Sequence, residues 1–176
     1  MHILIALVGI IIAGYVWALR ARNAANVATD IADMAGDVRA AARRFGFSRR
    51  ANVHPAESIE DPNIAAAGIA SAFIALDDLP TRDEKDALNV QLRRVLQVDQ
   101  QTSTELMVLG HWLVEECHGP QPAITRLGKK LYRLEGPSAI EPLMDILGGV
   151  LSNKDNILSE RQQEAIQELK TAFRLR

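Results

Sequence analysis

The feature that most constrains this chain is its first segment, which has no Asp, Glu, Lys or Arg before Arg20. Residues 3–19 read ILIALVGIIIAGYVWAL, long enough to cross a bilayer as a slightly short helix. Tyr15 and Trp17 lie near the end of this run, where amphipathic rings favour the headgroup layer. A cleaved signal peptide would need positive charge before the apolar run and small residues after it. We therefore expect residues 1–20 to form an uncleaved transmembrane anchor.

The arginines that follow the apolar run predict its orientation. Only Met1 and His2 precede the run, whereas seven arginines lie between residues 20 and 50. The positive-inside rule then places the N-terminus outside and the rest of the chain in the cytoplasm. A single cysteine, Cys117, fits a reducing compartment. The expected location is the bacterial inner membrane, single-pass, with a periplasmic N-terminus and a cytoplasmic domain.

Small residues recur on one face of the predicted span, and such a face lets another transmembrane helix approach closely. The face consists of Ala6, Gly9, Ala13 and Val16. Small residues are common in membrane spans, so chance explains the spacing about equally well. If the face is used, the expected partner is an integral membrane protein complex in the same lipid bilayer.

Residues 21–46 predict an amphipathic juxtamembrane helix. Apolar side chains recur at alternating intervals of three and four, which gives an a/d seam. The seam consists of Ala24, Val27, Ile31, Met34, Val38, Ala41 and Phe45. Asp30, Asp33 and Asp37 argue against a position on anionic lipid, which leaves packing on the protein's own domain, slightly favoured, or on a partner helix. Gly46 is expected to end the helix as a C′ residue.

The remainder of the chain predicts an all-α bundle of about six helices, because no segment alternates with period two for long enough to make a strand. A linker at residues 47–58 precedes this domain, which we place at residues 59–176. Four expected helix starts are Asp61 before Pro62, Thr81 with Glu84, Thr102 with Glu105, and Ser159 with Gln162. With 48% hydrophobic residues and a net charge of -2, wholesale disorder and a strongly basic nucleic-acid binder are excluded.

Two helix–loop–helix units look alike when Asp77 is aligned with Asp155. Each unit then gives an acidic residue, a turn-forming residue, an apolar residue, a hydroxyl N-cap, and Glu or Gln three positions later. Tight turns followed by capped helices account for this pattern without a ligand.

The repeated pattern within a small α-bundle resembles the TerB-like domain of tellurite-resistance-associated proteins, over roughly residues 60–176. A similar domain follows a single N-terminal anchor in membrane-bound DnaJ-like co-chaperones. A J-domain would need a His-Pro-Asp motif after the body of the chain, and none is present, so the resemblance does not extend to co-chaperone activity.

The resemblance implies that acidic loop residues could bind a divalent metal. The matching positions are Asp77, Glu84, Asp155 and Gln162, whereas Asp78 and Asn156 replace the family's loop glycines. Because hard cations prefer charged oxygens, the amide of Gln162 weakens such a site. The candidate ligands are Asp77, Asp78, Glu84 and Asp155. Capped turns without a metal are the favoured interpretation.

Other residue groups have weaker functional interpretations. His111, Glu115 and His118 fall on one predicted helix face that could hold a transition metal, although a solvated face is more usual. Cys117 lies on the apolar face and is expected to be buried and inert. Arg126, Lys129, Lys130 and Arg133 form a small basic face, expected to be solvated, with docking to an anionic surface as the alternative. No group combines a nucleophile, a base and an oxyanion site.

These features predict a non-catalytic accessory or scaffolding subunit that docks a cytoplasmic TerB-like domain onto a larger membrane complex of respiratory or transport type. Trp112, Tyr132 and the seam would supply its partner contacts. No cofactor, nucleic acid or small-molecule substrate is expected. The alternative is a divalent-metal-responsive sensor of tellurite or envelope stress that uses the acidic turns.

Overall fold

The computed structural model describes residues 36–47, 52–152 and 158–174. Several predicted features lie outside these ranges: the anchor with Ala6, Gly9, Ala13 and Val16, the seam residues Val27, Ile31 and Met34, and the loop residue Asp155. Among the helices that are described, none is both long enough and apolar enough to cross a bilayer.

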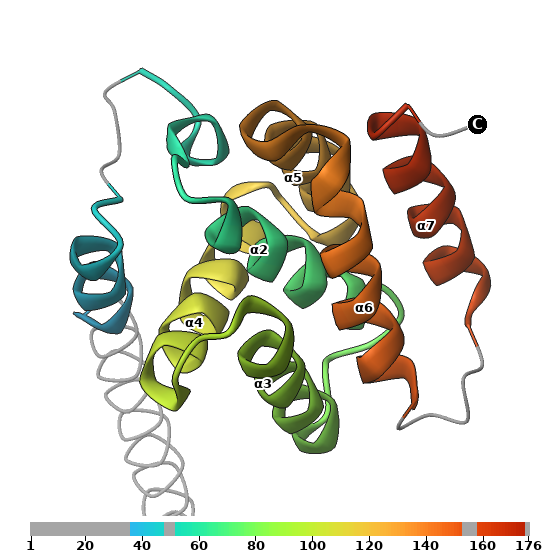
Figure 1. Cartoon of the computed structure of the whole chain (residues 1–176), viewed down its shortest axis with the longest axis horizontal. Helices are drawn as coiled ribbons and strands as arrows, with labels where there is room; N and C mark the ends of the chain where they lie inside the picture. The colour runs from blue at the N-terminus through green and yellow to red at the C-terminus, as the bar shows by residue number, and fades with distance from the viewer. Residues whose placement is uncertain (1–35, 48–51, 153–157, 175–176) are drawn as a thin grey trace, which may run out of the picture. The chain divides into compact units, whose positions relative to one another are not determined.

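Every regular element in the described ranges is helical, which confirms the all-α prediction (Figure 1). The α-helices are α2 (Pro62–Ile74), α3 (Arg82–Leu96), α4 (Gln100–Glu116), α5 (Pro120–Glu135), α6 (Ile140–Leu151) and α7 (Glu160–Ala172). Two 3-10 turns, η1 (Pro55–Ser58) and η2 (Gly136–Ala139), precede α2 and α6. A further helix occupies residues 36–44. Residues Val38–Arg176 form one compact unit, to which the description below refers.

Helix α2 is the centre of this unit, and it packs most extensively on α4 and α5. Every residue from Ile64 to Ile74 is buried, so the helix has no solvated face. Its Ala-rich sequence brings α4 very close: a Cβ at Gly110 of α4 would lie 2.8 Å from the backbone oxygen of Ala67 and 2.7 Å from Oγ of Ser71. A helix that is apolar on all sides is stable only when other helices surround it. Figure 1 shows α2 enclosed in this way.

Three of the predicted helix starts are confirmed. The Asp61 side chain accepts a hydrogen bond from the Asn63 backbone N–H at 2.8 Å. Capping boxes are present at Thr81 and at Ser159, as the spacing to Glu84 and Gln162 predicts. These interactions join residues two or three apart, so a short sequence pattern is sufficient to identify them.

The predicted start at Thr102 is wrong, because α4 begins at Gln100 with Asp99 as its N-cap. Helix α3 ends at Leu96, and its C-cap Gln97 lies in the left-handed region (φ 56°), which brings Asp99 directly to the start of the next helix. The Asp99 carboxylate accepts from the Thr102 backbone N–H at 2.7 Å. Glu105, the expected partner of Thr102 in a capping box, accepts from Arg44 instead.

Residues 38–47, hereafter segment 38–47, belong to the same compact unit as the six helices. The helix ends at Gly46, which has φ +63°, and the Phe47 N–H donates to the Ala42 carbonyl at 2.8 Å. This six-to-one hydrogen bond is the Schellman motif that a C′ glycine favours, and it confirms the predicted end of the helix. Ala41 is 1% exposed, and Val38 and Phe45 pack against the core.

Candidate interaction surfaces

In the first helix–loop–helix unit, the Glu84 side chain is folded back onto the start of α3. One carboxylate oxygen, Oε2, accepts from both the backbone N–H and the hydroxyl of Thr81, each at 2.8 Å. Glu84 is 8% exposed, whereas Asp77 and Asp78 lie exposed in the preceding loop. The Glu84 carboxylate is therefore already used to cap the helix.

In the second unit, an amide makes the same arrangement. The Ser159 N–H donates to Oε1 of Gln162 at 3.2 Å, and the Gln162 N–H donates back to the Ser159 hydroxyl at 3.1 Å. Arg161 of this unit donates to the Leu76 carbonyl at 3.0 Å, which joins the start of α7 to the end of the helix before Asp77. This guanidinium places positive charge beside the loop in which the first unit's metal ligands were predicted.

Candidate metal ligands do not gather in the described part of the chain, where no group of three or more His, Cys, Asp or Glu residues could hold an ion. His111 and Glu115 approach to 3.6 Å on the exposed surface of α4. His118 lies beyond the end of that helix with φ 65°, so it does not continue their face. Asp155 lies outside the described residues.

Cys117 is 4% exposed at the end of α4, as its place on the apolar face predicts. Burial raises the pKa of the Cys117 thiol above its ordinary value, and the nearby Arg126 guanidinium opposes that shift only in part. A thiol that resists ionisation is a poor nucleophile. The residue therefore contributes to packing.

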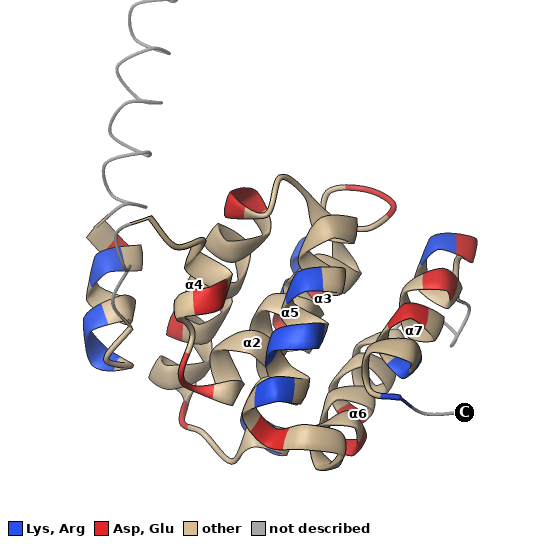
Figure 2. Ribbon diagram, turned by 90° about the horizontal axis from the view of Figure 1, so that it is seen from above, with Lys and Arg blue, Asp and Glu red and all other residues tan. Residues whose placement is uncertain are grey.

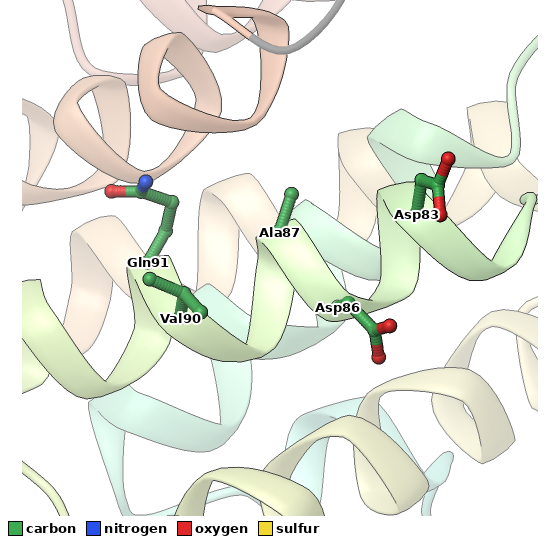
Figure 3. Close-up of a pocket in the computed structure, with 5 residues that line it drawn as sticks. All are labelled: Asp83, Asp86, Ala87, Val90 and Gln91. Atoms are coloured by element: carbon green, nitrogen blue, oxygen red, sulfur yellow. The ribbon is translucent and has the colours of Figure 1, made fainter.

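A shallow groove of about 550 Å³ runs along α3 (Figure 3). Its lining consists of Asp83, Asp86, Ala87, Val90 and Gln91. Val90 is 53% exposed. The Gln91 side chain lies so close to Gly149 of α6 that a Cβ added at Gly149 would be 2.3 Å from the Gln91 side-chain amide. The lining has two carboxylates but no nucleophile or histidine, which fits a surface contact better than a reaction site.

The contact between segment 38–47 and α4 combines ionic and aromatic interactions. Arg44 donates to Oε1 of Glu105 and to the hydroxyl of Thr102, both at 3.1 Å. The same guanidinium lies 3.8 Å from the Asp99 carboxylate. The sequence pattern does not reveal these pairs, because the partners of Arg44 lie more than 50 residues away in the chain.

Both aromatic residues expected on a partner surface are half-buried within the compact unit. Trp112 packs edge-on against Phe47 with ring centroids 5.7 Å apart. Tyr132 packs edge-on against Phe173, also at 5.7 Å, and the Arg174 guanidinium lies 5.3 Å from its ring centroid. Trp112 therefore attaches segment 38–47 to α4, and Tyr132 attaches the end of α7 to α5.

Basic residues form a row along the outer side of α5, visible as blue bands in Figure 2. Arg126, Lys129 and Arg133 are exposed, and Lys130 is half-buried. Arg133 is paired with the Glu57 carboxylate of η1 at 2.6 Å, and the Lys130 ammonium donates to the Glu57 backbone carbonyl at 2.8 Å.

The turn η1 lies inside the segment that was predicted to be a linker, yet Pro55, Ala56 and Ser58 are buried. His54 begins the turn: its Nδ1 accepts from the Ala56 N–H at 3.2 Å, and its Nε2 lies 3.0 Å from the Glu116 carbonyl. Because Nδ1 accepts, Nε2 is the nitrogen that donates to Glu116. His54 thus satisfies a carbonyl at the C-terminal end of α4.

No family model, curated protein or solved structure matches this chain. The resemblance to the TerB-like domain therefore rests on the residues of the two helix–loop–helix units.

Proposed function

We propose that this protein is a single-span inner-membrane protein whose cytoplasmic TerB-like bundle serves as a non-catalytic accessory or scaffolding module of a larger membrane complex. The apolar segment at residues 3–19 supports the anchor, and the arginines that follow it support the orientation. The order of helices and the two capping boxes are consistent with the TerB-like resemblance.

The observation that carries this proposal is the packing of segment 38–47 on α4. The segment leads from the predicted anchor into the bundle, and it is held by Arg44, by the buried Ala41 and by the Phe47–Trp112 pair. A flexible linker at this point would let the domain move independently of an anchor. Because segment 38–47 packs on α4, this helix belongs to the bundle itself, which supports a folded module that begins soon after the predicted anchor.

The test is purification of the full chain, C-terminally tagged, from its native membrane in mild detergent, followed by mass spectrometry. Ala6→Leu and Gly9→Leu enlarge the predicted docking face. Ala18→Leu is the matched control, because it adds the same bulk on the opposite face of the predicted helix. We expect a stoichiometric membrane complex that survives Ala18→Leu and is lost with Ala6→Leu or Gly9→Leu.

Three outcomes would contradict the proposal in different ways. Release of the chain from membranes by alkaline carbonate would show that the chain has no membrane-spanning anchor. Elution of the wild type alone, at monomer or dimer mass, would show that the chain does not belong to a larger complex. Equal loss of partner in all three leucine variants would show that the predicted face has no special role.

A further inference from the structure

The outer side of α5 is strongly basic in an otherwise acidic bundle. No Asp or Glu occurs between Cys117 and Leu134, whereas the chain as a whole has a net charge of -2. Arg126 and Lys129 are exposed, and neither side chain has an ion pair or hydrogen bond to another described residue. Arg126, Lys129 and Arg133 are three and four positions apart, so they lie along one face of the helix.

The carboxylates of Glu57 and Glu168 lie beside α5. Glu57 neutralises one cation through its pair with Arg133, and Lys130 donates to the Glu57 backbone carbonyl. The exposed Arg126 and Lys129 contribute two positive charges to the row. Glu168 accepts from the neutral side chains of Gln121 and Thr125, near the first turns of α5.

We propose that this basic row, comprising Arg126, Lys129, Lys130 and Arg133, contacts the anionic headgroups of the inner membrane leaflet and so orients the bundle. The inference rests on the proposed membrane anchor. It names a lipid surface as a second partner, separate from any protein that the transmembrane helix binds.

Side-chain chemistry favours a lipid surface over a protein partner. Protein interfaces depend on buried apolar or aromatic anchors, whereas headgroups attract basic residues by charge alone. The large hydrophobic residues that are exposed in the described ranges are Val53, Leu79 and Val90, and none lies on α5. Nucleic acid is disfavoured because the whole chain is acidic, with a pI of about 6.1.

Attachment to the membrane makes this modest charge sufficient. Each Lys or Arg near an anionic surface favours the contact by about fivefold, so Arg126 and Lys129 together favour it by about twenty-fivefold. A domain tethered by an anchor is always close to the membrane surface. The attraction between the basic row and the headgroups therefore has to favour one orientation of the domain, and does not have to bring it to the membrane. The contact should weaken as ionic strength rises.

The experiment uses the full chain in nanodiscs, with Cys117→Ala and one fluorescent label on an introduced cysteine. Pro122→Cys places the label on the same face of α5 as the basic row, and Lys85→Cys places a control label on α3, which packs on α4 and α6. Nitroxide lipid in the disc quenches labels near the surface. Discs of neutral phosphatidylcholine are compared with discs that also contain about 30% phosphatidylserine.

We expect quenching at position 122 to increase several-fold in anionic discs, while quenching at position 85 does not. Arg126→Gln with Lys129→Gln should abolish the increase. Arg93→Gln with Arg94→Gln should preserve it, because these exposed arginines on α3 carry the same charge but lie off the row. Circular dichroism of each double variant checks that the helices are intact.

Quenching at position 122 that ignores lipid charge, or that survives loss of Arg126 and Lys129, would overturn the inference. So would cross-linking of the row to a protein instead of to lipid. Carbonate extraction distinguishes failure of the proposed membrane anchor from failure of the lipid contact. A chain that stays in the membrane after extraction but shows no charge-dependent quenching contradicts only the lipid contact.

Discussion

At Gly110, the backbones of α2 and α4 leave no room for a side chain. A Cβ would lie 2.8 Å from the Ala67 backbone oxygen, and a backbone atom cannot rotate away as a side chain can. Gly110→Ala must therefore push the two helices apart. We expect it to lower the free energy of unfolding by about 2 kcal/mol, measured by urea denaturation of the full chain in mild detergent.

Gly148 on α6 offers a matched control for Gly110, because a Cβ there meets nothing within 4 Å. Gly148→Ala should raise the free energy of unfolding by about 0.5 kcal/mol, since alanine has the higher helix propensity. Equal effects of the two substitutions would contradict the close approach of α2 and α4.

Asp99 should make the stability of the bundle depend on acidity. The Thr102 backbone N–H, and then its side chain, stabilise the carboxylate and lower the pKa of Asp99 below its ordinary value of 3.8. A lowered folded-state pKa gives stability that is present above the ordinary carboxyl pKa and is lost as pH falls through the folded-state value.

Asp99→Asn keeps a capping oxygen but removes this charge. Between pH 5 and about pH 3, thermal melting should therefore shift less in Asp99→Asn than in the wild type. Parallel shifts in the two proteins would show that other carboxyl groups account for all of the acid sensitivity in this range.

Among the elements, the helix starts show how much local sequence can predict. Thr81 with Glu84 and Ser159 with Gln162 were identifiable because each pair closes within one turn. Thr102 with Glu105 matched the same pattern and was wrong, because Asp99 caps α4 three residues earlier and Glu105 accepts from the distant Arg44 instead. Packing of segment 38–47 on the protein's own domain was the slightly favoured prediction, and Val38, Ala41 and Phe45 contact the core as it requires. Its partners on α4 were not identifiable, because they come from a distant helix.

Glu84 can be tested as a cap against its predicted role as a metal ligand. Gln162 occupies the equivalent position in the second unit and makes the same hydrogen bond with an amide oxygen. Glu84→Gln should therefore cost less than about 1 kcal/mol of unfolding free energy, whereas Thr81→Ala should cost about 1 kcal/mol. Urea denaturation measures both.

The metal hypothesis makes a different prediction for the same residue. A melting temperature that rises with calcium, manganese or zinc in the wild type, but not in Glu84→Gln or Asp77→Asn, would support a metal site. We expect no such difference, because the Glu84 carboxylate caps α3 and Arg161 lies beside the Asp77 loop.

The contact of segment 38–47 with α4 should open locally when its anchoring side chains are removed. Phe47→Ala should speed amide exchange at residues 38–46 by about tenfold, since it removes the ring contact with Trp112. Arg44→Met should have a smaller effect, about two- to fivefold, because its ion pairs are partly solvated.

Arg43 is the matched control for Arg44. It is exposed, and its side chain has no ion pair or hydrogen bond with any residue that the structure describes. Arg43→Met should leave the exchange rates unchanged, as hydrogen exchange read by mass spectrometry would show. An equal increase in both arginine variants would mean that net charge, and not the contact with Glu105, holds the segment.

For the whole molecule, the compact unit begins at Val38 and not at the predicted domain boundary of residue 59. A chain that starts at residue 36 should therefore keep its melting temperature, whereas one that starts at residue 48 loses the cover over Trp112. We expect the shorter chain to melt about 5–10 °C lower, measured by circular dichroism. Equal melting temperatures would show that segment 38–47 adds nothing to the bundle.

The complete burial of α2 has a consequence for synthesis of the protein. Its apolar residues are synthesised before α4 and α5, which cover them. At about 5–20 residues per second, the 61 residues that follow Ile74 through Glu135 take about 3–12 seconds to add. If the proposed anchor is inserted into the membrane, the nascent chain presents α2 to the insertion machinery as a second apolar stretch during that interval. With 13 residues, α2 spans about 20 Å, too short for a bilayer core of about 30 Å, so its length keeps it from becoming a second span.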